Sequence, residues 1–164
     1  MTLEIQDHEV RRHDQADRVR ANTAHDTNVL IDRDTEAHLL YYASRGEEEI
    51  SCRIDELERE WDIERMLETN ASIVAFAGLA LGTTVNKKWL ILPGLVLPFL
   101  FQHALQGWCP PLPLLRRIGV RTRKEIDREK YALKALRGDF EGVPTATATE
   151  KTCGVDQAWQ AVNS

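Results

Sequence analysis

Residues 71–105 read ASIVAFAGLALGTTVNKKWLILPGLVLPFLFQHAL, and the only formal charges in this stretch are the adjacent Lys87 and Lys88. On either side of the lysines lies an apolar run without a polar face, Ala71 to Val85 and Trp89 to Leu105. A helix that is apolar all round needs either lipid or a large protein shell around it. The pattern therefore predicts an all-α membrane protein built on a two-helix transmembrane hairpin, flanked by cytoplasmic amphipathic helices.

The length of the two runs decides how well they can cross a bilayer. As helices they rise about 22 Å and about 25 Å, whereas the hydrocarbon core is roughly 30 Å thick. Starting the first helix at Leu67 removes most of the shortfall, while Trp89 and Trp108 can anchor at the interfaces. We therefore expect two spans in a lipid bilayer. The alternative is a soluble helical domain that buries the apolar hairpin.

The charges around the hairpin predict its orientation. Basic residues flank the two runs more densely than they occur at the turn, which holds only Lys87 and Lys88. By the positive-inside rule, both termini then lie in the cytoplasm. Met1 to Val10 contains no apolar stretch typical of a secretory signal. The net charge of -5 provides no basic field for nucleic acid, so no DNA or RNA partner is expected.

Two regions are predicted before the hairpin. Residues 1–46 form a polar helical region, in which Gly46 ends the last helix. Residues 47–66 form an amphipathic helix that leads straight into the membrane. Its narrow apolar stripe fits either a coiled-coil seam with another subunit, or packing on lipid or on the chain's own C-terminal helix. The stripe consists of Ile50, Ile54, Leu57 and Trp61.

The hairpin belongs to a predicted two-helix transmembrane domain over residues 67–122. Pro110, Pro111 and Pro113 cannot continue a regular helix, so the chain turns there. The sequence Thr122-Arg123-Lys124-Glu125 matches a capping box and opens a helix over residues 123–138, which Gly138 ends. Residues 139–164 are expected to form a flexible tail.

Short motifs at the hairpin resemble those of a known family. They are Leu81-Gly82-Thr83-Thr84-Val85-Asn86, Gly107-Trp108-Cys109, Leu114-Leu115 and Gly119. Over roughly Ile63 to Thr122, their order resembles the two-helix transmembrane domain of the YgaP-like inner-membrane proteins, whose better-known members carry a rhodanese domain in front of it. Here Cys52 lies in a strongly helical pattern and not at the start of a persulfide-binding loop. The resemblance therefore implies insertion in a bacterial-type inner (plasma) membrane and self-association, but not sulfur transfer.

A stripe of small residues, Ala71, Ala75, Gly78 and Gly82, lies on one face of the first run. Small faces let helices approach closely in lipid, where packing drives association. The stripe can receive the second run of the same chain, a second copy of the chain, or both in a four-helix bundle. We therefore expect helix-packing roles for these residues, and a homo-oligomer or another membrane protein as partner.

Cys109 is the candidate reactive thiol. It lies at the proline-broken exit of the second run near Arg116 and Arg117, and nearby cations favour the thiolate. A membrane-linked thiol or persulfide carrier that uses Cys109 is therefore an alternative function. The plain interpretation is a small apolar residue in a tight bend.

No residue pattern points to catalysis, a cofactor or a metal site. His8 and His13 are one residue too far apart for an H-E-x-x-H pair and would point about 140° apart on a helix. The three cysteines lack Cys-x-x-Cys spacing. The expected function is therefore a non-enzymatic, membrane-anchoring or assembly module.

Overall fold

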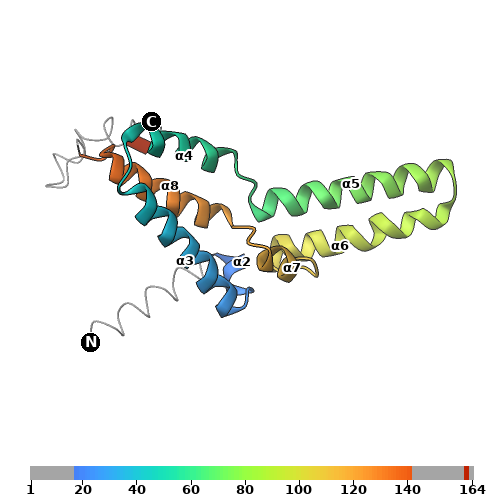
Figure 1. The fold of residues 1–164 in the computed structure, drawn as a ribbon. Coiled ribbons are helices and arrows are strands. Elements are labelled where there is room, and N and C mark those ends of the chain that lie inside the picture. Colours follow the sequence, from blue (N-terminus) through green and yellow to red (C-terminus); the bar gives the residue numbers. More distant parts are fainter. Residues whose placement is uncertain (1–16, 142–160, 163–164) are drawn as a thin grey trace, which may run out of the picture. The chain divides into compact units, whose positions relative to one another are not determined.

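The computed structural model describes residues 17–141 and 161–162, and its secondary structure there is entirely helical (Figure 1). The predicted all-α class is confirmed for these residues. The elements are α2 (Arg18–Ala21), α3 (His25–Tyr42), α4 (Glu47–Arg59), α5 (Ile63–Thr84), the 3-10 helix η1 (Lys87–Leu90), α6 (Ile91–Gln106), α7 (Leu112–Arg117) and α8 (Arg123–Arg137).

The chain forms two compact units, each built from segments that are far apart in the sequence. The first unit comprises Met1–Arg33 and Trp61–Glu125, and the second comprises Asp34–Glu60 and Ile126–Ser164, as far as these ranges are described. The sequence predicted a linear series of regions. The structure instead groups α2 and the start of α3 with the hairpin.

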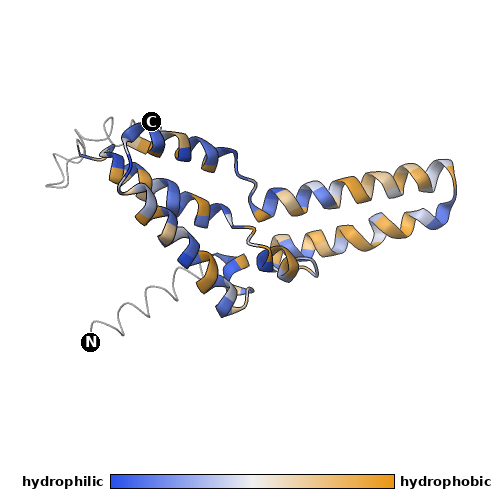
Figure 2. Ribbon diagram, viewed as in Figure 1, coloured by the Kyte–Doolittle hydropathy of each residue, from blue (hydrophilic) through white to orange (hydrophobic). Residues whose placement is uncertain are grey.

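α5 and α6 lie side by side as an antiparallel hairpin, joined by η1 (Figure 1). The side chain of Asn86 begins η1 by accepting a hydrogen bond from the Lys88 amide at 2.9 Å. Two helices in the described part of the chain are long and apolar enough to cross a membrane. Only 17% of the apolar segment of the first and 6% of that of the second is buried. Figure 2 shows hydrophobic residues along both legs.

The large apolar side chains of the hairpin are exposed. Phe76, Ile91 and Phe101 have relative exposures of 75%, 72% and 67%. The alternative of a soluble domain requires these side chains to be covered by the rest of the chain. Within the first unit, the other described residues do not cover them.

The helix expected over residues 47–66 is interrupted, which corrects the prediction of a direct entry into the first span. α4 ends at Arg59, Glu60 has an extended backbone, and α5 begins after Asp62. The Asp62 carboxylate accepts a hydrogen bond from the Arg65 amide at 2.8 Å, which is the N-cap geometry that starts a new helix. Trp61, the last residue of the predicted stripe, is 45% exposed, and the Arg65 guanidinium lies 4.6 Å from its ring centroid.

The remaining stripe residues form the core of the second unit. Ile50, Ile54 and Leu57 of α4 pack with Ile126 and Leu133, which follow the start of α8. Of the alternatives predicted for the stripe, packing on the chain's own C-terminal helix is confirmed.

The predicted bounds of the C-terminal helix agree with α8. Gly138 follows the helix with a φ of 93°, a left-handed conformation that glycine adopts without steric strain. Of the predicted tail, the structure describes residues 139–141 and 161–162. The rest of the tail and residues 1–16, with Cys153 and the two early histidines, lie outside the described residues.

Part of the small-residue stripe lies in the contact between the two legs. Gly78 and Gly82 are buried, whereas Ala71 and Ala75 are half-buried. A Cβ added at Gly78 would lie 2.5 Å from Pro93 Cδ and 2.8 Å from the Leu92 Cβ, and one at Gly82 would lie 2.5 Å from Leu90 Cδ2. The glycines thus allow the legs of one hairpin to approach closely. Packing of this face against a second copy stays a prediction.

We predict that Gly78→Ala weakens the hairpin, because the proline ring at Pro93 cannot move aside as a flexible side chain would. The expected loss in free energy of unfolding is about 1–3 kcal/mol, the usual range for overpacking. It is measured by denaturant unfolding in detergent micelles, followed by circular dichroism. The matched control is Gly94→Ala, because a Cβ added at Gly94 meets no atom within 4 Å. Equal effects of the two substitutions would contradict the close contact at Gly78.

Candidate functional site

A buried carboxylate held by two arginines lies in the first unit. Arg116 donates two hydrogen bonds to Glu125, one to each carboxylate oxygen, both at 2.7 Å. Arg20 Nη1 donates a third to Glu125 Oε1 at 2.6 Å. The side chains of all three residues are at most 2% exposed. Paired hydrogen bonds between a guanidinium and a carboxylate are among the strongest that side chains form, so this cluster fixes the local geometry.

The predicted capping box supplies the rest of the Glu125 environment. The Thr122 amide donates to Glu125 Oε2 at 2.7 Å, and the Glu125 amide donates to Thr122 Oγ1 at 3.3 Å. These reciprocal bonds confirm the capping box. Burial alone would raise the pKa of Glu125, but the hydrogen bonds and positive charge of Arg116, with the bonds from the Thr122 amide and Arg20, hold that pKa below its usual value.

The same cluster connects four segments of the chain. Arg116, from α7, donates to Asn28 Oδ1 in α3 at 2.9 Å and to Thr23 Oγ1 at 3.2 Å. Arg20, from α2, also pairs with Asp32 at 2.8 Å. From the sequence, Arg116 was expected to be a cation near Cys109 at the membrane, and not a partner of Glu125. The pairing of Arg116 depends on partners that are distant in the sequence, and no local motif indicates this pairing.

Helix α2 closes the end of α6. Arg18 Nη1 donates to the Ala104 carbonyl at 2.5 Å, and Asn22 Nδ2 donates to the Gln106 carbonyl at 2.8 Å. The last carbonyls of a helix lack partners within the helix, so these bonds satisfy them. Gly107 ends α6 with a φ of 72°, and a Cβ there would lie 2.5 Å from the Arg18 Cβ. Glycine at this position permits both the turn and the contact.

Cys109 lies in an apolar cluster beside this network and is only 3% exposed. The cluster also contains Val19, Ile63, Leu67 and Leu112. Burial raises the pKa of the Cys109 thiol, with a hydrogen bond involving the Leu112 backbone opposing part of this rise. Arg116 was expected to favour the thiolate form of Cys109. In the structure, its guanidinium binds Glu125 instead. A reactive Cys109 stays a prediction, and nothing in its surroundings favours it.

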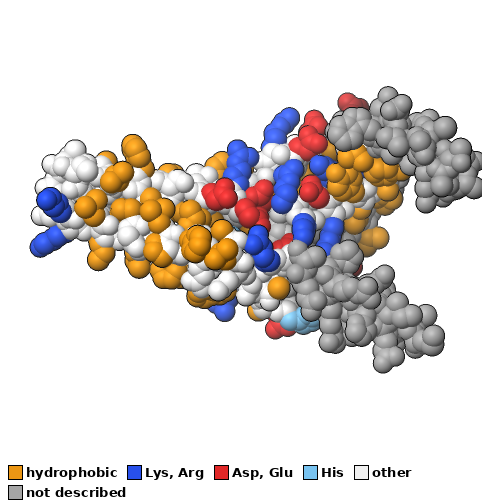
Figure 3. Space-filling model, turned by 180° about the vertical axis from the view of Figure 1, so that it is seen from behind, with side chains coloured by type: hydrophobic (Ala, Val, Ile, Leu, Met, Phe, Trp, Pro, Cys, Tyr) orange, Lys and Arg blue, Asp and Glu red, His pale blue; other side chains and the backbone are white. Residues whose placement is uncertain are grey.

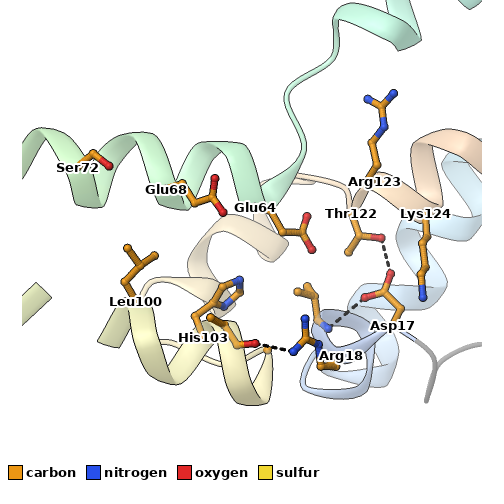
Figure 4. A pocket seen from close by; sticks show the side chains of 13 residues that line it. Asp17, Arg18, Glu64, Glu68, Ser72, Leu100, His103, Thr122, Arg123 and Lys124 are labelled. Carbon is orange, nitrogen blue, oxygen red and sulfur yellow. Dashed lines mark hydrogen bonds between the residues drawn. The ribbon is translucent and has the colours of Figure 1, made fainter. Parts of the chain in front are cut away.

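A cavity of about 840 Å³ opens at the hairpin base, by which we mean the first turns of α5 and the last turns of α6 (Figure 4). Its wall combines acidic, basic and apolar side chains from both legs, from α2 and from the start of α8. The lining residues are Asp17, Arg18, Val19, Glu64, Glu68, Ser72, Leu100, His103, Ala104, Gly107, Thr122, Arg123 and Lys124.

Two buried polar atoms in this cavity have no hydrogen-bond partner. Among the residues that the structure describes, they are Glu64 Oε2 and His103 Nδ1. His103 is 8% exposed, and Figure 4 shows both side chains extending into the space between the legs. Buried polar groups are normally paired, and leaving one unpaired costs about 1–3 kcal/mol. These two atoms make the cavity the best candidate for a binding site.

The described residues provide no metal centre at this place. In the described ranges, no group of three or more His, Cys, Asp and Glu side chains could hold a metal ion. No known protein family, curated protein or solved structure matches this chain. The resemblance to YgaP-like proteins therefore stays a prediction.

We predict that the first unit becomes less stable as the pH is lowered, because the Glu125 carboxylate becomes protonated. Its pKa in the folded protein lies below the unfolded value of about 4.3, so its stabilising effect is complete above that value and is lost as pH falls through the folded pKa. Glu125→Gln should remove this dependence. It should also cost about 3–5 kcal/mol at pH 7, because it leaves buried arginines without their carboxylate.

The measurement is denaturant unfolding in detergent between pH 7 and pH 3. The control is Asp26→Asn, since Asp26 is exposed and outside the network. A wild-type pH dependence that survives in Glu125→Gln would contradict the assignment.

We predict that Cys109 reacts with maleimide at least about tenfold more slowly than Cys52, because burial and a raised pKa both reduce the accessible thiolate. Cys52 is exposed and serves as the internal reference. Rates are measured on folded single-cysteine variants that carry Cys153→Ser. Fast labelling of Cys109, together with capture of a persulfide on it, would instead support the thiol-carrier alternative.

Proposed function

We propose that this chain is a small integral membrane protein whose α5–α6 hairpin inserts into a lipid bilayer. Its remaining helices then act as a non-enzymatic anchoring or assembly module at the membrane surface. The observation that carries the proposal is the exposed apolar surface of the hairpin, directly joined to a base of buried, paired charges.

The surface of the hairpin supports lipid as its surroundings. Figure 3 shows hydrophobic side chains covering one face of both legs, up to basic side chains at the tip. Soluble monomers rarely expose a contiguous apolar patch of more than about 300–600 Å². In the hairpin, exposed apolar side chains recur on each leg, among them Ile73, Leu79, Leu95, Leu97 and Leu105.

The helix lengths also support insertion. From Leu67 to its end at Thr84, α5 rises about 27 Å, which is close to the roughly 30 Å of a hydrocarbon core. Trp89 and Trp108 flank α6 at its two ends and are 44% and 36% exposed, as expected for aromatic anchors at opposite interfaces. The first span gains length because α5 begins before Ala71, and the second span gains length because η1 and α6 together cover Lys87–Gln106.

The distribution of basic residues supports an orientation for the hairpin. The tip holds Lys87 and Lys88, whereas the first unit carries Arg18, Arg20, Arg116 and further arginines at the hairpin base. The positive-inside rule then favours a cytoplasmic base, with both termini cytoplasmic. The bacterial-type inner membrane is proposed from the resemblance to YgaP-like proteins.

Assembly with a second copy or with another membrane protein is part of the proposal. Gly78 and Gly82 already pack within the hairpin, so a partner would use the other exposed faces of α5 and α6. The resemblance of the hairpin to the YgaP-like transmembrane domain points to the same kind of module. Cross-linking of the full chain in membranes would identify the partner.

We predict that a single cysteine at the tip, Lys87→Cys in a cysteine-free chain, reacts with a membrane-impermeant maleimide in intact cells. The matched variant Arg117→Cys, at an exposed position of α7, should react only after permeabilisation. Carbonate extraction should leave the protein in the membrane pellet. Recovery in the supernatant, or a monodisperse protein in buffer without detergent, would overturn the proposal.

A further inference from the structure

We propose that the cavity at the hairpin base binds the headgroup of a phospholipid that carries a primary ammonium group. Glu64 and His103 would hold the ammonium, and the basic side of the cavity would face the phosphate. This inference rests on the proposed function, because a phospholipid reaches the cavity only if the hairpin lies in a bilayer.

The cavity has the dimensions and the polarity of an amphiphile site. Its volume of about 840 Å³ lies within the usual range of ligand pockets, roughly 300–1,000 Å³. Arg123 and Lys124 line one part, whereas Ser72 and Leu100 line the part farthest along the legs (Figure 4). Beyond that part, the legs present exposed apolar side chains. A headgroup in the cavity would thus have its acyl chains along the hairpin.

The unpaired atoms select the type of headgroup. Glu64 Oε2 can only accept hydrogen bonds when the carboxylate is ionised, and His103 Nδ1 accepts one when the ring proton is on Nε2. Glu68, one turn along α5, adds negative charge at the same wall. A primary ammonium offers three N–H donors and a positive charge. A quaternary ammonium, such as choline, has no N–H to donate.

The opposite charges of the lining favour a zwitterion over an anion. Asp17 is already used, because its carboxylate accepts from the Val19 and Arg20 amides and from Thr122 Oγ1. The two acids left to meet a ligand are therefore Glu64 and Glu68, both on α5. Arg18, Arg123 and Lys124 line the side of the cavity formed by α2 and the start of α8, and Arg18 Nη1 also donates to the Ala104 carbonyl. A purely anionic headgroup would leave Glu64 and Glu68 without a partner.

Metal binding does not explain the same residues. The Glu64, Glu68 and His103 side chains do not form a group that could ligate one metal ion. A headgroup separates its positive and negative charges by several atoms, which suits a cavity whose acids and bases lie on different elements. We therefore assign the cavity to an aminophospholipid.

The test is native mass spectrometry of the full chain, released from micelles doped with equal amounts of phosphatidylethanolamine, phosphatidylcholine and phosphatidylglycerol. We expect phosphatidylethanolamine to be retained at least about tenfold more than either of the others, as charge-assisted hydrogen bonds would give. Glu64→Gln should reduce this preference about tenfold, whereas Glu48→Gln, at an exposed position outside the cavity, should leave it unchanged. Equal retention of the three lipids by the wild-type protein would overturn the assignment.

Free phosphoethanolamine distinguishes a lipid from a soluble ligand. It should not displace phosphatidylethanolamine at equal concentration, because it lacks the acyl chains that contact the hairpin. Displacement at equal concentration would overturn the lipid assignment in favour of a soluble amine phosphate.

The helix content and thermal midpoint of Glu64→Gln show whether it folds. If it does not fold, Ser72→Leu replaces it, because leucine narrows the cavity from its apolar end and leaves the polar groups in place. The substitute should lower phosphatidylethanolamine retention, and unchanged retention would contradict the site. Carbonate extraction of the same samples separates the two proposals. A protein that stays in the pellet without a lipid preference overturns only the headgroup site, whereas a protein in the supernatant overturns both.

Discussion

The buried contact between Glu125 and the guanidinium groups of Arg116 and Arg20 organises the first unit. A carboxylate at 2% exposure is tolerated only when its charge and lone pairs are matched, and here they are matched by side chains from α7 and α2 and by the Thr122 amide. Each arginine brings a second partner, Asn28 for Arg116 and Asp32 for Arg20. The requirement to pair one buried charge therefore draws four segments together.

Among the described residues of the first unit, this arrangement leaves the hairpin without a protein shell. The segments that follow α6 and precede α3 bind one another through charged groups, and the apolar cluster of Val19, Ile63, Leu67, Cys109 and Leu112 is confined to the hairpin base. Above it, the legs contact each other through Gly78 and Gly82 and present their other faces outward. Because water is a poor environment for such a surface, lipid is the natural one. The division between a polar base and bare apolar legs is the physical basis of the anchoring proposal.

The two sets of charged groups at the base differ in how completely they are paired. Glu125, Arg116 and Arg20 use their hydrogen-bonding capacity on one another and on neighbours, which suits a structural role. Glu64 and His103, in contrast, each keep a buried atom without a partner and line the adjoining cavity. A fixed network next to an unsatisfied cavity is the arrangement expected of a preorganised binding site. The location at the end of the apolar legs makes a membrane amphiphile the best match.

The sequence by itself determined the features that depend on neighbouring residues. Apolar runs around Lys87 and Lys88 predicted the hairpin, the spacing from Thr122 to Glu125 predicted the capping box, and Gly138 predicted the end of α8, because helix periodicity and capping are local. The tertiary structure was needed to show that Glu125 binds Arg116 and also Arg20, 105 residues away, and that Glu64 and His103 line one cavity. These features arise from contacts between distant segments, and a charged residue in a sequence does not reveal whether its partner will be water or a buried arginine.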